Sequence, residues 1–141
     1  MNAKPKYKVL IADDSEDDRL FLRLTLQRNP RFQLVGEVED GEETIEYLSG
    51  SGKFSDRQTY PFPDVLLLDI KMPRKTGHEV LDWLRSQPSI GLFVAVVSGS
   101  GLQEDVTLSF SLGASGHFKK DAFKEQQSAL LQAIEQVLDK T

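Results

Sequence analysis

Five short apolar segments, separated by longer stretches of mixed character, set the pattern of the chain. Each is rich in Val, Leu or Phe and lacks the alternation of polar and apolar residues that a half-exposed strand shows. Continuous apolar runs of this length are typical of strands buried on both faces of a parallel sheet. The predicted strands are residues 9–12, 34–38, 65–68, 93–97 and, with a weaker pattern, 116–118.

The segments between these strands have the apolar spacing of helices. The first follows Ser15, a good N-cap, and carries three acids in its first turn, which complement the helix dipole. Its apolar stripe is expected at Leu20, Phe21 and Leu24. Two later segments show similar spacing: Val80, Leu81 and Leu84 in one, and Leu130, Ile134, Val137 and Leu138 in the last.

Strands and helices that alternate in this way predict an α/β fold with three layers. We expect a doubly wound, five-stranded parallel sheet with the flavodoxin-like strand order 2-1-3-4-5. The 141 residues are expected to form a single domain, residues 1–141.

Composition and charge exclude some classes of function. The net charge of -5 argues against nucleic-acid binding, which needs a positive surface. No apolar run is long enough to span a membrane, and the polar start is unlike a signal peptide. The chain has no cysteine, which excludes disulfides and fits a reducing compartment, so a cytoplasmic location is expected.

Polar residues follow the predicted strands at one end. In an open parallel sheet the carboxyl ends of the strands form the ligand site, near the point where the strand order reverses. Acids, a hydroxyl and an ammonium that are distant in sequence are therefore expected to meet there. They are Asp13 and Asp14 after the first strand, Asp69 after the third, Ser98 after the fourth, and Lys119 and Lys120 after the fifth.

This set of residue types suits phosphoryl transfer. Clustered carboxylates repel each other and need a cation, and a hard divalent ion with oxygen ligands, most simply Mg²⁺, would satisfy them. The lysine and the serine would instead bind an anion brought beside the metal. Charge neutralisation and positioning then supply most of the catalysis, and an Asp can be the nucleophile that becomes an acyl phosphate.

Four motifs, in order and spacing, resemble the receiver domains of two-component response regulators, the chemotaxis-regulator-like proteins included. The resemblance covers essentially the whole chain. The long segment 49–63, ahead of the third strand, is similar to the single-domain branch related to cyanobacterial phytochrome regulators. The motifs are Asp13-Asp14, Asp69-Ile-Lys-Met-Pro-Arg-Lys-Thr-Gly77, Val97-Ser98-Gly99 and Gly113-Ala-Ser-Gly-His-Phe-Lys-Lys120.

The resemblance implies a role for each site residue. Asp69 would be the phosphoacceptor, and Asp14, Asp69 and the backbone carbonyl of Lys71 would bind Mg²⁺, with Asp13 as a secondary ligand. Ser98 and Lys120 would contact the phosphoryl group. Ser98 and His117 would form the switch that reports phosphorylation. The protein would then be a phosphoacceptor that assists its own phosphoryl transfer and hydrolysis. It would not be an enzyme in the usual sense.

Two positions depart from the commonest family pattern. Asp121 follows Lys120 where many receivers have a proline with a cis peptide bond. Because a non-proline cis bond costs roughly 3 kcal/mol, a trans bond is expected here. His117 occupies the place of an aromatic switch residue, and its hydrogen bonding would differ from that of a tyrosine.

The same residues can also be interpreted as purely structural, without any role in phosphoryl transfer. Asp13-Asp14 could be a solvated turn, especially Asp13, because neighbours on a strand point in opposite directions. Asp69 could cap a turn, Ser98 could be a loop residue, and His117 a half-buried packing residue. Lysines are usually surface charges, and Lys119 is expected to be one.

Other functions fit the sequence less well. A flavodoxin-like cofactor binder needs an anion cradle after the first strand, where this chain has repelling acids. A dehalogenase-like phosphatase needs an acid two residues after the nucleophile, a position held here by Lys71. A degenerate receiver that acts as an unphosphorylated interaction module is the main alternative, although the complete set of acids, hydroxyl and lysine counts against it.

The expected partners are proteins. A sensor histidine kinase or a phosphotransfer protein would dock near the first helix and donate the phosphoryl group. The downstream target would be another protein, whose identity the sequence does not give, and a homodimer through the fourth and fifth helices is compatible with the architecture. No nucleic acid or membrane partner is expected, and no DNA-binding segment is expected after the last helix.

Overall fold

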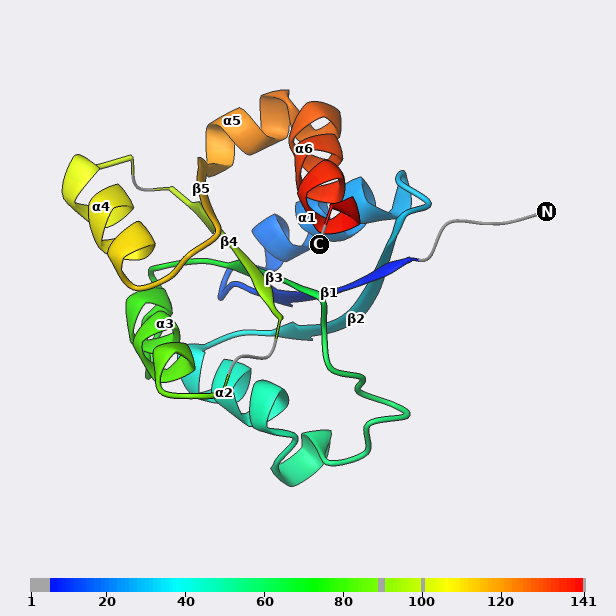
Figure 1. Ribbon diagram of the computed structural model, residues 1–141, viewed down its shortest axis with the longest axis vertical. Coiled ribbons are helices and arrows are strands. Elements are labelled where there is room, and N and C mark those ends of the chain that lie inside the picture. Colours follow the sequence, from blue (N-terminus) through cyan, green and yellow to red (C-terminus); the bar gives the residue numbers. More distant parts are fainter. Residues whose placement is uncertain (1–5, 89–90, 100, 141) are drawn as a thin grey trace.

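The computed structural model describes residues 6–88, 91–99 and 101–140. Its centre is a twisted parallel sheet of five strands in the order β2-β1-β3-β4-β5, with helices on both faces (Figure 1). The predicted fold class and strand order are therefore confirmed. Within the described ranges, none of the helices combines the length and apolar character that a membrane span requires.

All five predicted strands form, each within a residue or two of the expected bounds. The sheet pairs β1 with both β2 and β3, and β4 with both β3 and β5, always in parallel. The strands are β1 (Tyr7–Ala12), β2 (Phe32–Val38), β3 (Val65–Leu68), β4 (Phe93–Ser98) and β5 (Gly116–Lys119).

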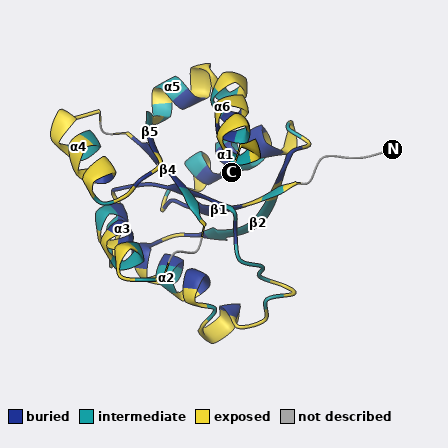
Figure 2. Ribbon diagram, in the orientation of Figure 1, coloured by how far each residue is buried: buried dark blue, intermediate teal, exposed yellow. Residues whose placement is uncertain are grey.

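The central strands are buried on both faces, as their continuous apolar sequences predict (Figure 2). Successive side chains of a strand point to opposite faces, so each strand supplies two cores. Leu66 and Leu68 of β3 join the cluster on one face, and Leu67 joins the cluster on the other. Two apolar cores therefore hold the sheet between its helix layers.

The helices divide between these two cores. Side chains from α1, α5 and α6 pack with one cluster, and side chains from α2 and α3 pack with the other, with α4 beside α3 (Figure 1). The helices are α1 (Glu16–Gln27), α2 (Gly41–Ser49), α3 (Gly77–Arg85), α4 (Gln103–Ser111), α5 (Lys120–Glu125) and α6 (Gln127–Asp139), and a 3-10 turn, η1 (Gly52–Phe54), follows α2.

The apolar stripe expected on α1 is confirmed for Phe21, which packs against the core, and is wrong for the other two residues. Leu20 and Leu24 are exposed, whereas Leu22 and Leu26 are buried against the sheet. The helix is apolar over much of its circumference, so spacing alone does not fix which side turns inward. Ser15 does cap it, since its hydroxyl accepts a hydrogen bond from the Asp18 backbone N–H.

The last predicted helix also differs in part. The chain forms two helices in sequence, the short α5 and then α6. In α6, Ile134 is buried as expected, but Leu131 is its buried partner and Val137 is exposed. The predicted face of α3 is confirmed, because Val80 and Leu81 are buried and Leu84 packs at the edge of the core.

The segment ahead of β3 forms a small aromatic cluster of its own. The rings of Tyr47, Phe54 and Tyr60 contact one another at centroid distances of 4.9–6.0 Å. Arg57 donates hydrogen bonds to the carbonyls of Tyr47, Leu48 and Tyr60, which ties the segment to the end of α2. These contacts keep the long connection packed at the edge of the fold, away from the carboxyl ends of the strands.

Candidate functional site

The residues predicted from the strand ends do converge on one edge of the sheet. Asp13 and Asp14 follow β1, Ser98 is the last residue of β4, and Lys120 follows β5. An open pocket of about 490 Å³ lies at this edge. Its lining residues are Asp14, Asp69, Lys71, Ser98, Gly99, Gly101, Leu102 and Lys120.

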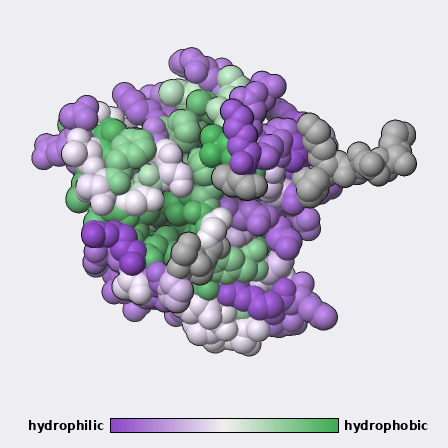
Figure 3. Space-filling view, viewed as in Figure 1, coloured by the Kyte–Doolittle hydropathy of each residue, from purple (hydrophilic) through white to green (hydrophobic). Residues whose placement is uncertain are grey.

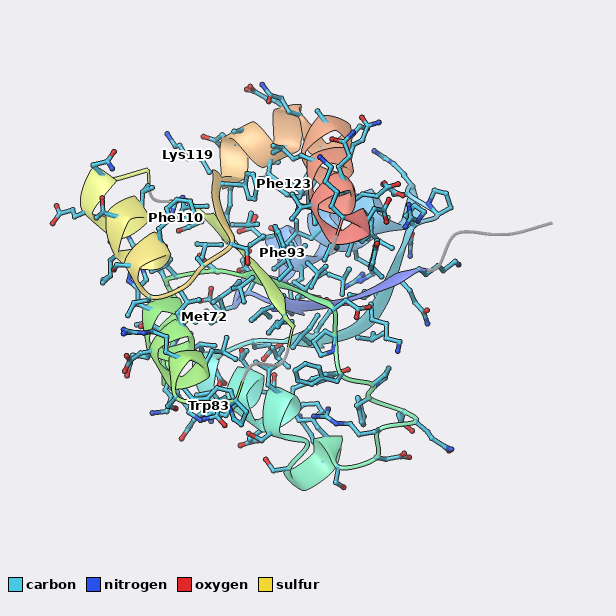
Figure 4. All side chains as sticks on the ribbon, in the orientation of Figure 1. Met72, Trp83, Phe93, Phe110, Lys119 and Phe123 are labelled. Carbon is cyan, nitrogen blue, oxygen red and sulfur yellow. The ribbon has the colours of Figure 1, made fainter. Side chains whose placement is uncertain are left out.

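The ammonium of Lys120 is the centre of the cluster. Its Nζ lies 2.9 Å from Asp13 Oδ2 and 3.2 Å from Asp69 Oδ2. Its shortest contact, 2.7 Å, is to Oδ2 of Asp18 on α1. The expectation that Lys120 reaches the acids is therefore confirmed, while Lys119 is exposed and points outward (Figure 4).

Asp18 is a member of the cluster that sequence reasoning missed. It was accounted for as one of the acids that complement the N-terminus of a helix. The sequence pattern does not distinguish it from Glu16 and Asp17, the other acids of that first turn.

The two acids after β1 have different environments. Asp13 is almost fully buried, its Oδ1 accepts a hydrogen bond from the Ser15 backbone N–H, and its Oδ2 faces Lys120. The interpretation of Asp13 as part of a solvated turn is wrong, because its side chain is buried and is paired with Lys120. Asp14 is exposed and lines the pocket.

Burial changes the ionisation of this cluster. Desolvation raises the pKa of Asp69 above its ordinary value, and the charge of Asp13 adds to this, against the opposing charge of Lys120. Burial alone would lower the pKa of Lys120, but hydrogen bonds to Asp18 and Asp13 and the charge of Asp69 raise it above its ordinary value. The lysine is therefore a permanent cation among more carboxylates than it can neutralise.

Close packing at the start of α3 presents Asp69. A Cβ on Gly77 would lie 2.3 Å from the carbonyl oxygen of Asp69, so only glycine allows this approach. The Gly77 N–H donates to the carbonyl of Ile70 at 2.7 Å. Thr76 and Glu79 complete a capping box, which fixes the first turn of the helix directly behind the loop.

A second contact fixes the loop after Asp69 from the side of α2. Arg74 has a positive φ of 65°, which is uncommon for a residue with a side chain, and its guanidinium pairs with Asp40. Asp40 is also the N-cap of α2 and accepts a hydrogen bond from the Glu43 backbone N–H. The Gly41 N–H donates to the Lys75 carbonyl at 3.0 Å, so the loop and the start of α2 form one packed unit. Sequence reasoning did not find this pair.

The two proposed switch residues lie on neighbouring strands. Ser98 is fully buried at the pocket, and it pairs in register with Lys119, while His117 pairs with Val96 two residues further from the edge. The Nε2 atom of His117 is buried and has no hydrogen-bond partner among the described residues. Burial lowers the pKa of His117 below its ordinary value. The operation of Ser98 and His117 as a switch stays a prediction.

The Lys120–Asp121 peptide is trans, as expected, since the described residues contain no cis bond. The helix α5 begins at Lys120 itself. The lysine is therefore held at its backbone by the first turn of a helix as well as by its salt bridges. Its neighbour Phe123 points inward and is buried beneath α5 (Figure 4).

The acids fit a divalent cation. One carboxylate oxygen from each of Asp13, Asp14 and Asp69 lies within 4.8 Å of the other two. Oxygen donors with net negative charge are the ligands of hard cations such as Mg²⁺ and Mn²⁺. The raised pKa of Asp69 also indicates a cation site, because the cluster has more negative charge than Lys120 neutralises. Lys71 lines the same pocket.

Comparison with known families agrees with this fold and this site. The family model described as the response regulator receiver domain matches residues 9–135, which is most of the chain. The chain belongs to the response regulator receiver family.

Individual relatives support the same assignment. The nitrate/nitrite response regulator protein NarL of Escherichia coli K12 is 34% identical over 128 residues, which cover 91% of this chain and 53% of that protein. The response regulator Rcp1 of Synechocystis is 26% identical over 132 residues, which cover 93% of this chain and 87% of Rcp1. The chain spans about half the length or less of several curated relatives that it matches, NarL among them.

Solved structures of phytochrome regulators are also similar. The phosphorylated cyanobacterial phytochrome response regulator RcpA superposes with a TM-score of 0.79 at 28% identity, covering 92% of this chain and 91% of RcpA. The Mn²⁺-bound form of Rcp1 gives a TM-score of 0.75 at 26% identity, covering 86% of this chain and 90% of that one. The resemblance to this branch, predicted from the segment 49–63, is thus matched by relatives from it.

Proposed function

We propose that this receiver accepts a phosphoryl group on Asp69 and thereby changes a protein-interaction surface. The observation that carries the proposal is the position of Asp69: a buried carboxylate at the strand-end pocket, 3.2 Å from the ammonium of Lys120 and within a cluster of acids. A carboxylate in this setting can act as a nucleophile toward phosphorus, with a cation beside it.

The proposed reaction exchanges one bond to phosphorus for another. An oxygen of Asp69 attacks the phosphorus, and the bond from phosphorus to the donor breaks, with its electron pair leaving on the donor. A phosphohistidine donor releases imidazole, which takes a proton from solvent, and acetyl phosphate releases acetate. Later attack by water on the phosphorus releases inorganic phosphate and restores the Asp69 carboxylate. The protein is thus a phosphoacceptor that assists its own modification.

Mg²⁺ is the proposed metal. Asp14, Asp69 and the backbone carbonyl of Lys71 would bind it, with Asp13 as the secondary ligand, and the ion would supply positive charge beside the phosphoryl oxygens. The chain's own residues supply the remainder. Lys120 would pair with a phosphoryl oxygen as a point charge, and the Ser98 hydroxyl would donate a hydrogen bond to another.

A degenerate receiver is the alternative function, and the geometry counts against it. A receiver that works without phosphorylation has no need to bury Asp13 and Asp69 beside a single lysine, an arrangement that raises the pKa of Asp69. Buried acids in excess of their counter-charge cost stability, so they indicate a site retained for chemistry.

The proposed readout couples Ser98 to His117. When Ser98 moves to donate to the phosphoryl group, space opens into which His117 can turn, which would reshape the face of α4, β5 and α5. Ser98→Ala should still accept phosphate but show a weak response at His117, followed as the ring signals in NMR with and without beryllofluoride. Equal changes in wild type and variant would exclude this route.

The proposed partners are a sensor histidine kinase or phosphotransfer protein as donor and another protein as target. Leu20 and Leu24 are exposed on α1, the helix that follows Asp14, and they support docking of a donor at that helix. Leu108 and Phe110 are exposed on α4, and Figure 3 shows hydrophobic surface over this helix, which supports a protein target or a homodimer there. A cytoplasmic location is part of the proposal, because such donors are made from ATP inside the cell.

The test of the proposal is chemical phosphorylation without a kinase. Wild type treated with acetyl phosphate and Mg²⁺ should gain the mass of one phosphoryl group, and the adduct should be lost in mild base. Asp69→Asn should gain none, and Asp64→Asn, an acid at the other end of β3, should behave as wild type. A stable adduct, or labelling of Asp69→Asn, would contradict the proposal.

A further inference from the structure

Asp18 makes the shortest contact to Lys120, and the proposed reaction gives it no role. Its Oδ2 lies 2.7 Å from Nζ of Lys120, and its side chain is 22% exposed. Partial burial opposes its ionisation, but the hydrogen bond and charge of Lys120 outweigh this and hold the pKa of Asp18 below its ordinary value. Asp18 is therefore a persistent negative charge directly beside the lysine.

The early start of α5 explains why Asp18 can hold this position. Because the helix begins at Lys120, Lys120 and Lys124 stand one turn apart on the same face. The two oxygens of Asp18 face these two lysines, Oδ2 toward Lys120 and Oδ1 toward Lys124 at 3.7 Å. The acid on α1 thus connects to both lysines of α5 at once.

The donors of Lys120 are fully used in this arrangement. An ammonium has three N–H donors, and three carboxylate oxygens lie around Nζ, those of Asp18, Asp13 and Asp69. A phosphoryl oxygen on Asp69 can therefore gain a hydrogen bond from Lys120 only if one of these carboxylates gives up its own. Asp18 is the strongest competitor by distance, and it lies outside the acidic trio that fits a metal.

We propose that Asp18 competes with the phosphoryl group for the ammonium of Lys120 and so restrains phosphorylation of Asp69. Asp18 is then a positioning residue, which keeps the lysine on the α1 side in the unphosphorylated protein. This inference rests on the proposed function and adds a regulatory element to it. It also places the restraint on α1, the helix where the donor is proposed to dock.

The test uses a variant that keeps the acceptor and removes the charge. Asp18→Asn can still accept a hydrogen bond from Lys120 through its amide oxygen, but it no longer holds the lysine by charge. Phosphorylation by acetyl phosphate at saturating Mg²⁺ should be roughly 3–10-fold faster, the range that corresponds to the interaction of two unit charges about 4 Å apart in bulk water. Beryllofluoride, measured by calorimetry, should bind tighter by a similar factor.

Two controls separate this effect from general charge and from folding. Asp17→Asn removes the same charge from an exposed neighbour on the same turn and should change the rate less than about 2-fold. Asp18→Glu restores a carboxylate and should return the rate toward wild type. Asp18→Ser provides a second neutral acceptor if the asparagine variant does not fold, as judged by its melting temperature.

The outcomes distinguish this inference from the proposed function. If wild type is labelled on Asp69 but Asp18→Asn is no faster than Asp17→Asn, or is slower than wild type, competition by Asp18 is overturned and the phosphoacceptor role stands. If wild type is not labelled on Asp69 at all, both are overturned. A rate gain in Asp18→Asn that Asp18→Glu reverses supports the inference.

Discussion

Two ion-pair clusters, each built around one cation, lie at opposite ends of the sheet. At the amino end, Arg31 directly precedes β2 and pairs with two acids of α6. Its Nη1 lies 2.8 Å from Glu135 and its Nη2 2.7 Å from Asp139, whose side chains are 19% and 36% exposed. These acids keep part of their hydration, and the planar guanidinium meets both of them, so the cluster fastens α6 to the sheet.

The cluster at the carboxyl end also pairs a cation with acids, but its charges are balanced differently. Asp13 and Asp69 are only 2% and 5% exposed, and Lys120 is shared among them and Asp18. Burial raises the pKa of Asp69 there, so its charged form is destabilised in the folded state. Both clusters contain ion pairs, so ion pairs alone do not mark a reactive site. What distinguishes the reactive site from the structural one is buried negative charge in excess of the positive charge that neutralises it.

The largest expected difference between the clusters is in phosphorylation rate. Lys120→Gln should lower the rate with acetyl phosphate by about 100-fold, the usual cost of removing one donor that stabilises transition-state charge. Arg31→Gln should leave the rate within about 2-fold of wild type, since screening is strong between distant charges. The phosphorylation rates are followed by mass spectrometry. If both variants lost the same factor in rate, the proposed difference between a reactive and a structural cluster would be wrong.

Arg31 should instead matter for stability. Arg31→Gln leaves Glu135 and Asp139 without their shared cation, so the melting temperature should fall by roughly 5 °C. Calorimetry in the absence of divalent ions is the measurement. An unchanged melting temperature would mean that the amino-end cluster contributes nothing to the fold and that the contrast with Lys120 has been misread.

Mg²⁺ should stabilise the carboxyl-end cluster alone. An ion that binds only the folded state adds about 1.4 kcal/mol at ten times its Kd, a rise in melting temperature of about 4 °C. Asp14→Asn should remove most of that rise, whereas Glu135→Gln should keep it. Equal shifts in wild type and Asp14→Asn would place the ion elsewhere.

The smallest expected effect concerns the cost of ionising Asp69. Its pKa is raised in the folded protein by burial, so the folded state binds a proton more readily than the unfolded state does. Ionisation therefore costs stability above the folded pKa, and this cost disappears as the pH falls through that value toward the unfolded one.

Asp69→Asn should accordingly raise the melting temperature at pH 7 without Mg²⁺, by roughly 3 °C, and the gain should shrink on acidification to pH 4. Asp139→Asn, the matched variant in the amino-end cluster, should lower the melting temperature at pH 7. A gain for Asp69→Asn that stays constant with pH would assign the effect to packing.

Much of the fold could be predicted because the strands carry a signal in their own sequence. Val65 to Leu68 form an unbroken apolar run, which is typical of a strand buried on both faces, and the acid after it marks the strand end. The parallel arrangement then brings Asp13, Asp69 and Lys120 together without further information.

What could not be predicted depends on how elements rotate and meet in space. Helix α1 is apolar on more than one side. Its spacing is therefore as compatible with burial of Leu20 and Leu24 as with burial of Leu22 and Leu26, and packing against the sheet determines which pair is buried. The contact of Asp18 with Lys120 joins residues 102 positions apart, on two helices whose crossing the sequence does not encode locally.

The most direct test of the central claim locates the phosphoryl group on the chain. Wild type phosphorylated by acetyl phosphate with Mg²⁺ is reduced with borohydride, which converts a phosphorylated aspartate to homoserine, and its peptides are sequenced by mass spectrometry. We predict homoserine at position 69 and at no other acid of the cluster. Conversion at Asp13, Asp14 or Asp18, or no conversion while the protein remains folded, would contradict the account.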